Sequence, residues 1–173
     1  MPTFEEFLVW LGQEKNPRAR TVELNIEAKS EELQPAYAPA PAVFAKMILD
    51  AVIKHGVADR STIQSFDFRV LLMARKLSAA IRTSVLLEER PSKTLVEVMA
   101  KLGAQVLSMN ERWLTQRDVL ALHKAGYRVI PWTANDEAVW QRLADYGVDG
   151  IITDDPAGLF EFRARWVAQH DPK

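Results

Sequence analysis

The chain has 173 residues, 48% of them hydrophobic, which is enough for one domain with a buried core. Its formal net charge of −1 gives no reason to expect a nucleic acid or an anionic membrane surface as a partner. It has no cysteine, which excludes disulfides and thiolate zinc sites, and no apolar run long enough to span a bilayer.

Helix-cap residues and a change in the spacing of apolar residues indicate the N-terminal helix and strand. Thr3 and Glu6 have the spacing of a capping box, and apolar residues then recur at helical spacing as far as Gly12. The stretch 21–30 (TVELNIEAKS) instead alternates polar and apolar side chains, as a strand with one buried face does. We expect a loop over the proline-rich stretch 34–41.

The polar face of the expected strand 21–30 carries a candidate site. The apolar face holds Val22, Leu24, Ile26 and Ala28, and the polar face holds Glu23, Asn25, Glu27 and Lys29. Glu27 and Lys29 come last, at the carboxyl end of the strand, where they point the same way and are able to hold a cation and an anion side by side. An edge strand with one solvated face explains the same alternation without any site.

Helices and strands alternate along the rest of the chain, and most of the helices stop at a glycine. Expected helices follow Pro41 and cover 67–77, 93–102, the stretch from Thr115 to Gly126, 136–146, and the C-terminus from Asp155. Expected strands cover 61–66, 81–87, 105–109, 127–133 and 148–153. The later strands are short apolar runs, which is typical of a parallel sheet covered on both faces.

This alternation predicts an α/β fold, and the strand count suggests which one. A complete (β/α)₈ barrel needs eight strands and roughly 250 residues, so six strands predict a partial TIM barrel with about six of the eight βα units. We expect residues 1–173 to form a single incomplete domain. A doubly wound sheet is the competing fold, but no glycine-rich phosphate loop follows the first strand.

The loops that follow strands carry the chemistry of a barrel, and those before strands carry its stability. His55 and His123 precede strands, each in the last turn of an expected helix, where a cation is mildly favoured, and His170 lies in the tail. None of the three is a good general base or metal ligand. Among residues after strands, Asp67, Asn135, Asp136 and Asp155 have an ordinary explanation as helix caps or first-turn acids, and Glu88 and Glu89 as a solvated loop.

The remaining residues after strands include Glu27, Lys29 and Trp132. Glu27 and Lys29 precede a proline-rich loop rather than a helix start, so they are the best site candidates by elimination. Trp132 is ambiguous, because most tryptophans at such positions belong to the core, whereas at a barrel mouth its ring would wall a substrate pocket.

Five short motifs, in this order and spacing, resemble the glycerophosphodiester phosphodiesterase family. They are PTFEEFL at 2–8, NIEAKS at 25–30, IQSFDF at 63–68, IPWTAN at 130–135 and GVDGIITDDP at 147–156. The resemblance covers nearly the whole chain but only about the C-terminal two thirds of the family domain.

The resemblance implies a (β/α)₈ barrel of the phospholipase-C-like phosphodiesterase type. Such an enzyme hydrolyses glycerophosphodiesters to glycerol 3-phosphate and an alcohol, in phospholipid and glycerol metabolism, with a divalent metal, commonly Ca²⁺ or Mg²⁺. By resemblance, Glu27 and Lys29 are catalytic residues, Glu27 as a metal ligand and Lys29 as a contact to the phosphate. Trp132, Gln64 and Phe66 border the substrate cavity. Oxygen ligands suit a hard cation, and an ammonium stabilises phosphoryl charge.

The chain departs from the family pattern in its first part. The family's His-Arg-Gly, Glu-x-Asp and His-Asp motifs do not occur there, and with them are missing both acid/base histidines and two of three protein metal ligands. We therefore expect this chain alone to be inactive or nearly so. An open barrel would also leave two sheet edges and part of an apolar interior uncovered, which favours self-association.

Two hypotheses follow for the function. The chain is either the C-terminal part of a glycerophosphodiester phosphodiesterase, or a non-catalytic truncated barrel that binds other molecules or complements a partner fragment. A Schiff-base role for Lys29 is much weaker, because Glu27 beside it would hold the amine charged. We expect a cytoplasmic location by default, or a periplasmic one if a lost N-terminus carried a signal.

Overall fold

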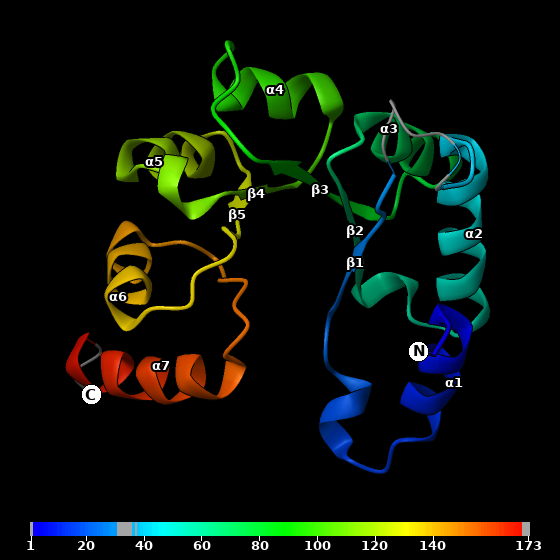
Figure 1. The fold of residues 1–173 in the computed structure, drawn as a ribbon, viewed down its shortest axis with the longest axis horizontal. Helices are drawn as coiled ribbons and strands as arrows, with labels where there is room; N and C mark the ends of the chain where they lie inside the picture. Colours follow the sequence, from blue (N-terminus) through cyan, green and yellow to red (C-terminus); the bar gives the residue numbers. More distant parts are fainter. Residues whose placement is uncertain (1, 31–35, 37, 171–173) are drawn as a thin grey trace. The chain divides into compact units, whose positions relative to one another are not determined.

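A computed structural model describes residues 2–30, 36 and 38–170 of the chain. Its contacts divide the chain into two compact units, Met1–Val85 and Leu86–Lys173 (Figure 1). Residues 34, 35 and 37 of the expected loop 34–41 lie outside the described residues, and its last residue, Pro41, begins α2. Among the described helices, none is long and apolar enough to cross a membrane.

The first unit alternates helices with parallel strands. Its elements are α1 (Phe4–Gln13), β1 (Leu24–Glu27), α2 (Pro41–Lys54), β2 (Ser61–Ser65), α3 (Phe68–Leu77) and most of β3 (Arg82–Leu87), with short 3-10 turns at Pro17–Arg20 and Ala58–Arg60. The capping box predicted at Thr3 and Glu6 is present, with both reciprocal hydrogen bonds. Gly12, expected to stop the helix, is instead its second-last residue.

One hydrophobic cluster of the first unit lies where α1 and α2 meet the start of β1. Its buried residues are Leu8, Leu11, Ala19, Leu24, Val52 and Val57. Ile26 packs against this cluster, as the predicted alternation requires, but Val22 lies before the strand and is 46% exposed. β1 pairs in parallel with β2, so that Glu27 lies opposite Gln64, and β2 pairs in parallel with β3. This register places the polar ends of β1 and β2 next to each other.

The second unit continues the same alternation from the end of β3. Its elements are α4 (Leu95–Leu102), β4 (Val106–Met109), α5 (Gln116–Lys124), β5 (Arg128–Val129), α6 (Glu137–Tyr146) and α7 (Pro156–His170), with a 3-10 turn at Glu111–Trp113. The capping box predicted at Thr115 and Asp118 is present. α6 is capped at its C-terminus by Gly147, whose φ of 79° suits glycine. α6 and α7 lie next to each other (Figure 1), and the rings of Trp140 and Phe162 lie 5.9 Å apart between them.

The expected last strand, 148–153, is not a regular strand. Asp149 N donates to Val129 O at 2.9 Å, and Ile152 N donates to Pro131 O at 2.9 Å. Three residues on this segment therefore face two on its partner, which is the spacing of a β-bulge and interrupts the ladder. The expected strand 127–133 is short for a related reason, since Pro131 has no N–H to donate.

The strands follow one another in the order β1-β2-β3-β4-β5, and all recorded pairings are parallel. β3 belongs to both units, because its last residues lie in the second, where Asn110 N donates to Leu87 O. A doubly wound sheet reverses its strand order at a switch point, and this order has no reversal. The α/β fold and the partial barrel are therefore confirmed, and the described residues form five regular strands instead of the expected six.

Candidate functional site

The end of β1 brings together the two candidates predicted from the sequence. Lys29 Nζ lies 3.9 Å from Glu27 Oε2. The lysine side chain is 82% exposed, and the glutamate side chain is 31% exposed. This surface ion pair adds little to stability, because exposed pairs contribute about 0–1 kcal/mol. A carboxylate and a free ammonium thus lie side by side at the carboxyl end of a strand, where a barrel carries its chemistry.

Gln64, on the neighbouring strand, is held by a residue that the sequence reasoning had given no role. Asn25 Nδ2 donates to Gln64 Oε1 at 2.8 Å, while Gln64 as a whole is only 8% exposed. The NH₂ group of Gln64 has no hydrogen-bond partner among the described residues, so its two donors remain available. The alternation over 21–30 placed Asn25 on the right face, but the pairing depends on the register between β1 and β2.

The turn after β2 is fastened to the end of β1 by hydrogen bonds. Ala28 N donates to Gln64 O, and Ser65 Oγ donates to Ala28 O at 2.7 Å. Phe66 follows β2 with 45% of its surface exposed. The backbone that carries Glu27 and Lys29 is therefore fixed to the backbone that carries Gln64 and Phe66.

Asp67 acts as a helix cap, as the sequence predicted, and also anchors the same region. Its carboxylate accepts from Arg69 N at 3.0 Å, from the Arg69 guanidinium at 2.8 and 2.9 Å, and from Ser30 Oγ at 2.7 Å. The Arg69 side chain lowers the pKa of Asp67 most, burial opposes this, and Ser30 and the Arg69 amide lower it further. Ser30, the last described residue before the loop, is thereby tied to the start of α3.

Trp132 belongs to the second unit, where its indole is half-buried. Its Nε1 donates to Ser108 O at 3.0 Å, and its backbone forms an isolated parallel bridge with Asn110. The peptide bond between Trp132 and Thr133 is cis. The indole is thus anchored through its nitrogen, and part of its surface stays accessible. Its proposed contact with a substrate stays a prediction from the sequence.

The polar residues near the end of the second unit serve mainly local structure. Asn135 was expected to cap a helix, but its amide instead binds Asp154 and accepts from Thr153 Oγ1 and Asp154 N. Asp136 occupies the cap position of α6 and makes no side-chain cap hydrogen bond. Asp155 does cap α7, accepting from Gly158 N at 2.9 Å.

The three histidines make the local contacts expected of structural residues. His55 Nε2 lies 2.9 Å from Glu5 Oε1, and His123 Nε2 lies 2.9 Å from Asp149 Oδ2. His170 Nδ1 lies 2.8 Å from the Trp166 carbonyl within α7. In the first unit, His55 follows the last residue of α2, a position that precedes β2 and is therefore opposite to the strand end carrying Glu27.

The described residues do not form a complete metal site. They include no group of three or more His, Cys, Asp or Glu side chains placed to hold an ion. Ca²⁺ takes six to eight oxygen ligands, and Mg²⁺ requires six. Glu27 supplies one carboxylate, and the Lys29 ammonium 3.9 Å from it repels a cation. This donor set by itself does not fit a divalent metal.

Comparison with known proteins bears directly on these observations. The sequence profile of the glycerophosphoryl diester phosphodiesterase family matches residues 1–158. The glycerophosphodiester phosphodiesterase of Bacillus subtilis (strain 168) is 28% identical over 160 residues, which are 90% of this chain and 52% of that protein. The chain therefore spans about half the length of this curated relative.

Solved structures show the same fold. A protein of Silicibacter pomeroyi DSS-3 aligns with a TM-score of 0.83 and 25% identity, covering 95% of this chain and 57% of that one. An Oleispira antarctica phosphodiesterase, solved in complex with the product sn-glycerol-3-phosphate, aligns with a TM-score of 0.79 and 22% identity, covering 94% and 61%. The resemblance inferred from five motifs is confirmed, and the chain belongs to the glycerophosphoryl diester phosphodiesterase family.

Proposed function

We propose that this chain carries one wall of a glycerophosphodiester-hydrolysing site, in which the Lys29 ammonium binds the substrate phosphate. The proposal is supported chiefly by the 3.9 Å contact between Glu27 and Lys29 at the end of β1. A phosphodiester bears one negative charge on its non-bridging oxygens, and a charge-assisted hydrogen bond from an ammonium is among the stronger polar contacts. Lys29 is largely exposed, so it reaches such an anion with little desolvation.

Glu27 and Gln64 complete this wall in the proposal. The Glu27 carboxylate orients the Lys29 ammonium, and it is able to contribute to a metal site together with further ligands. The NH₂ group of Gln64, fixed by Asn25, donates to a phosphate or glycerol oxygen. Phe66 offers an apolar surface beside it. The family generally uses a divalent metal, which supplies charge stabilisation when it is bound.

The same residues explain why we propose little turnover by residues 1–173 alone. Hydrolysis adds water across a phosphorus–oxygen bond, so the attacking water loses a proton and the leaving alkoxide gains one. Efficient catalysis needs a positioned side chain for these transfers, worth about 10²- to 10⁴-fold in rate. His55, the histidine described in the first unit, contacts Glu5 before β2 rather than lying at the end of β1.

Binding and turnover test separate parts of this proposal. We expect sn-glycerol 3-phosphate, titrated into the labelled chain, to shift the amide resonances of 25–30 and 62–67. Lys29→Met should weaken this binding about tenfold, which corresponds to ~1.4 kcal/mol. Lys46→Met is the matched control, because Lys46 is also an exposed lysine of the first unit, paired with Asp50 at 2.6 Å. Equal weakening by both variants would mean that only net charge matters.

The turnover test uses glycerophosphocholine with Ca²⁺, with Mg²⁺ and with neither. We expect no more than trace release of glycerol 3-phosphate under all three conditions. Robust metal-dependent turnover would contradict the proposed inactivity while leaving the binding role of Lys29 open to the titration.

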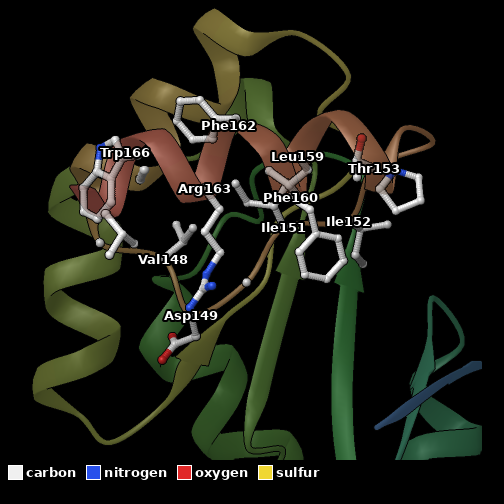
Figure 2. A pocket seen from close by; sticks show the side chains of 15 residues that line it. Val148, Asp149, Ile151, Ile152, Thr153, Leu159, Phe160, Phe162, Arg163 and Trp166 are labelled. Carbon is white, nitrogen blue, oxygen red and sulfur yellow. The ribbon is translucent and has the colours of Figure 1, made fainter. Parts of the chain in front are cut away.

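The second candidate function is a non-catalytic barrel segment that acts by binding a polypeptide. An apolar hollow of about 680 Å³ in the second unit, between α7 and the segment 148–153 (Figure 2), favours it. The nucleotide sequence upstream of Met1 distinguishes the two functions. In-frame codons for His-Arg-Gly and Glu-x-Asp would support the enzyme, and stop codons behind a ribosome-binding site at Met1 would support the binding module.

A further inference from the structure

A buried serine at the end of β2 makes two hydrogen bonds that support the candidate site. Ser65 is the last residue of β2, with 0% of its surface exposed. Its hydroxyl donates to Ala28 O at 2.7 Å and accepts from Asp67 N at 3.0 Å. A hydroxyl has one proton to donate, and this proton is used on the Ala28 carbonyl. Because Ser65 is buried, its role in the site acts through the residues that it holds.

Ala28, the residue that Ser65 holds, lies between Glu27 and Lys29. Its N–H donates to Gln64 O at 2.8 Å, which fixes the peptide group on the Glu27 side. Its carbonyl accepts from Ser65, which fixes the peptide group on the Lys29 side. Because a peptide group is planar, the second hydrogen bond also fixes the Cα atom of Lys29. The direction in which the lysine side chain leaves the backbone thus depends on the Ser65 hydroxyl.

The backbone of Lys29 itself has little other support. β1 ends at Glu27, and within the described part of the chain Lys29 makes no backbone–backbone hydrogen bond. The next contact comes one residue later, where Ser30 Oγ donates to Asp67 Oδ2 at 2.7 Å. The N–H of Asp67 in turn donates to Ser65 Oγ. The contacts on both sides of Lys29 therefore lead to Ser65.

A second buried serine on the same strand shows a purely structural use of a hydroxyl. Ser61, the first residue of β2, also has 0% of its surface exposed, and its Oγ donates to Val57 O at 2.8 Å. The two serines thus share the strand, the burial and the type of hydrogen bond. They differ in place, because Ser61 lies at the amino end of β2 and Ser65 at the carboxyl end. Removing either hydroxyl takes a donor from a carbonyl, so both substitutions should lower stability.

We propose that Ser65 is a positioning residue for Lys29, and that its hydroxyl sets the affinity of this site for a phosphate group. The inference rests on the proposed function, in which the Lys29 ammonium binds the substrate phosphate. The Lys29 side chain is 82% exposed, so its backbone is the part that the fold holds in place. A fixed backbone leaves fewer conformations to lose when the ammonium meets an anion, which raises the affinity.

The first measurement needs no ligand. Nitrogen-15 relaxation gives the order parameter of each backbone amide, which is about 0.85 for rigid backbone and below about 0.6 for flexible backbone. We expect the Lys29 amide of the wild-type chain to be as rigid as the amides of β1, although Lys29 lies beyond the strand. Ser65→Ala should lower the order parameter of Lys29 toward about 0.6. Ser61→Ala is the matched control and should leave it unchanged.

The second measurement is the titration of sn-glycerol 3-phosphate into the labelled chain. Ser65→Ala should raise the Kd about tenfold, which is the order of effect when a residue that orients a binding group is removed. Ser61→Ala should leave the Kd unchanged, and urea unfolding compares the stability that the two variants lose. In a Lys29→Met background, Ser65→Ala should raise the Kd no further, because the positioned ammonium is already absent.

The outcomes separate this inference from the proposed function. If the wild-type chain does not bind sn-glycerol 3-phosphate, or if Lys29→Met binds it equally well, the proposed function fails and the inference with it. If Lys29→Met weakens binding but the two serine variants have equal Kd values, the inference fails and the proposed function stands. An effect of Ser65→Ala that persists in the Lys29→Met background would overturn the inference too. A flexible Lys29 amide in the wild-type chain would overturn it without any variant, so the test holds even if Ser65→Ala does not fold.

Discussion

The carboxylate of Asp67 offers a way to measure how much one charge contributes to the stability of the first unit. Asp67→Asn keeps a good helix cap, because asparagine caps helices about as well as aspartate. It removes the negative charge of the carboxylate, which accepts hydrogen bonds from the Ser30 hydroxyl and the Arg69 guanidinium. The substitution therefore isolates the charge from the cap.

The expected magnitude follows from the exposure of the partners. A hydrogen bond to a charged group contributes about 1.5–3 kcal/mol when it is buried. The Asp67 side chain is 5% exposed, but that of Arg69 is 43% exposed and regains much of its hydration when the pair is lost. We expect Asp67→Asn to lower the free energy of unfolding by about 1 kcal/mol at pH 7.

The way in which the free energy of unfolding changes with pH gives the sign of the contribution from the Asp67 charge. Hydrogen bonds from Arg69 lower the pKa of Asp67 in the folded chain below its ordinary value of 3.8. The unfolded state therefore binds the proton more tightly, and the stabilisation is complete above pH 3.8. It is lost as the pH falls through the lower, folded-state pKa. The difference in unfolding free energy between wild type and Asp67→Asn should therefore shrink toward zero below the folded-state pKa.

Urea unfolding followed by circular dichroism at several pH values between 2.5 and 7 measures this difference. Asp136→Asn is the matched control, because Asp136 occupies the same cap position in α6 without a side-chain cap hydrogen bond. We expect that variant to stay within about 0.5 kcal/mol of wild type at every pH. The assigned role of the charge would be refuted if Asp67→Asn lowered the free energy of unfolding by the same amount at every pH. It would also be refuted if Asp136→Asn lowered it equally.

Substitutions at two glycines and a leucine test the packing. Gly158→Ala should destabilise the second unit by about 1 kcal/mol in urea unfolding, because the new Cβ would lie 2.2 Å from Asp155 Oδ2 and disturb that cap. Gly12→Ala should stabilise α1 by about 0.5–1 kcal/mol, since nothing lies within 4 Å of its added Cβ; a loss would contradict the open surface. Leu143→Ala should cost about 2–5 kcal/mol, because Leu143 is fully buried, whereas Leu120→Ala at an exposed position should cost far less.

Local sequence signals predicted the helices of this fold well. The pair of Thr115 and Asp118 forms the expected capping box, and Asp67 and Asp155 act as the expected caps. These features depend on residues three or fewer positions apart, so they can be predicted without knowledge of the fold. Gly147 at the end of α6 belongs to the same class.

Local sequence patterns did not predict the features that depend on how neighbouring strands are aligned. The segment 148–153 reads as a strand, but one extra residue against Pro131 turns it into a bulge. Asn135 looks like a helix cap, yet its amide binds Asp154, because a nonlocal partner lies within reach. The contact of Asn25 with Gln64 likewise follows from the pairing of β1 with β2, which alternation alone does not fix.

The sequential strand order has a consequence for how the chain reaches this structure. Each strand pairs with the next strand in the sequence, so one helix and its flanking loops must close before each pairing forms, rather than most of the chain. Such a topology lowers the entropic barrier to folding relative to one built from distant pairings. During synthesis, each strand and its helix find their partner soon after they emerge, without waiting for the distant end of the polypeptide.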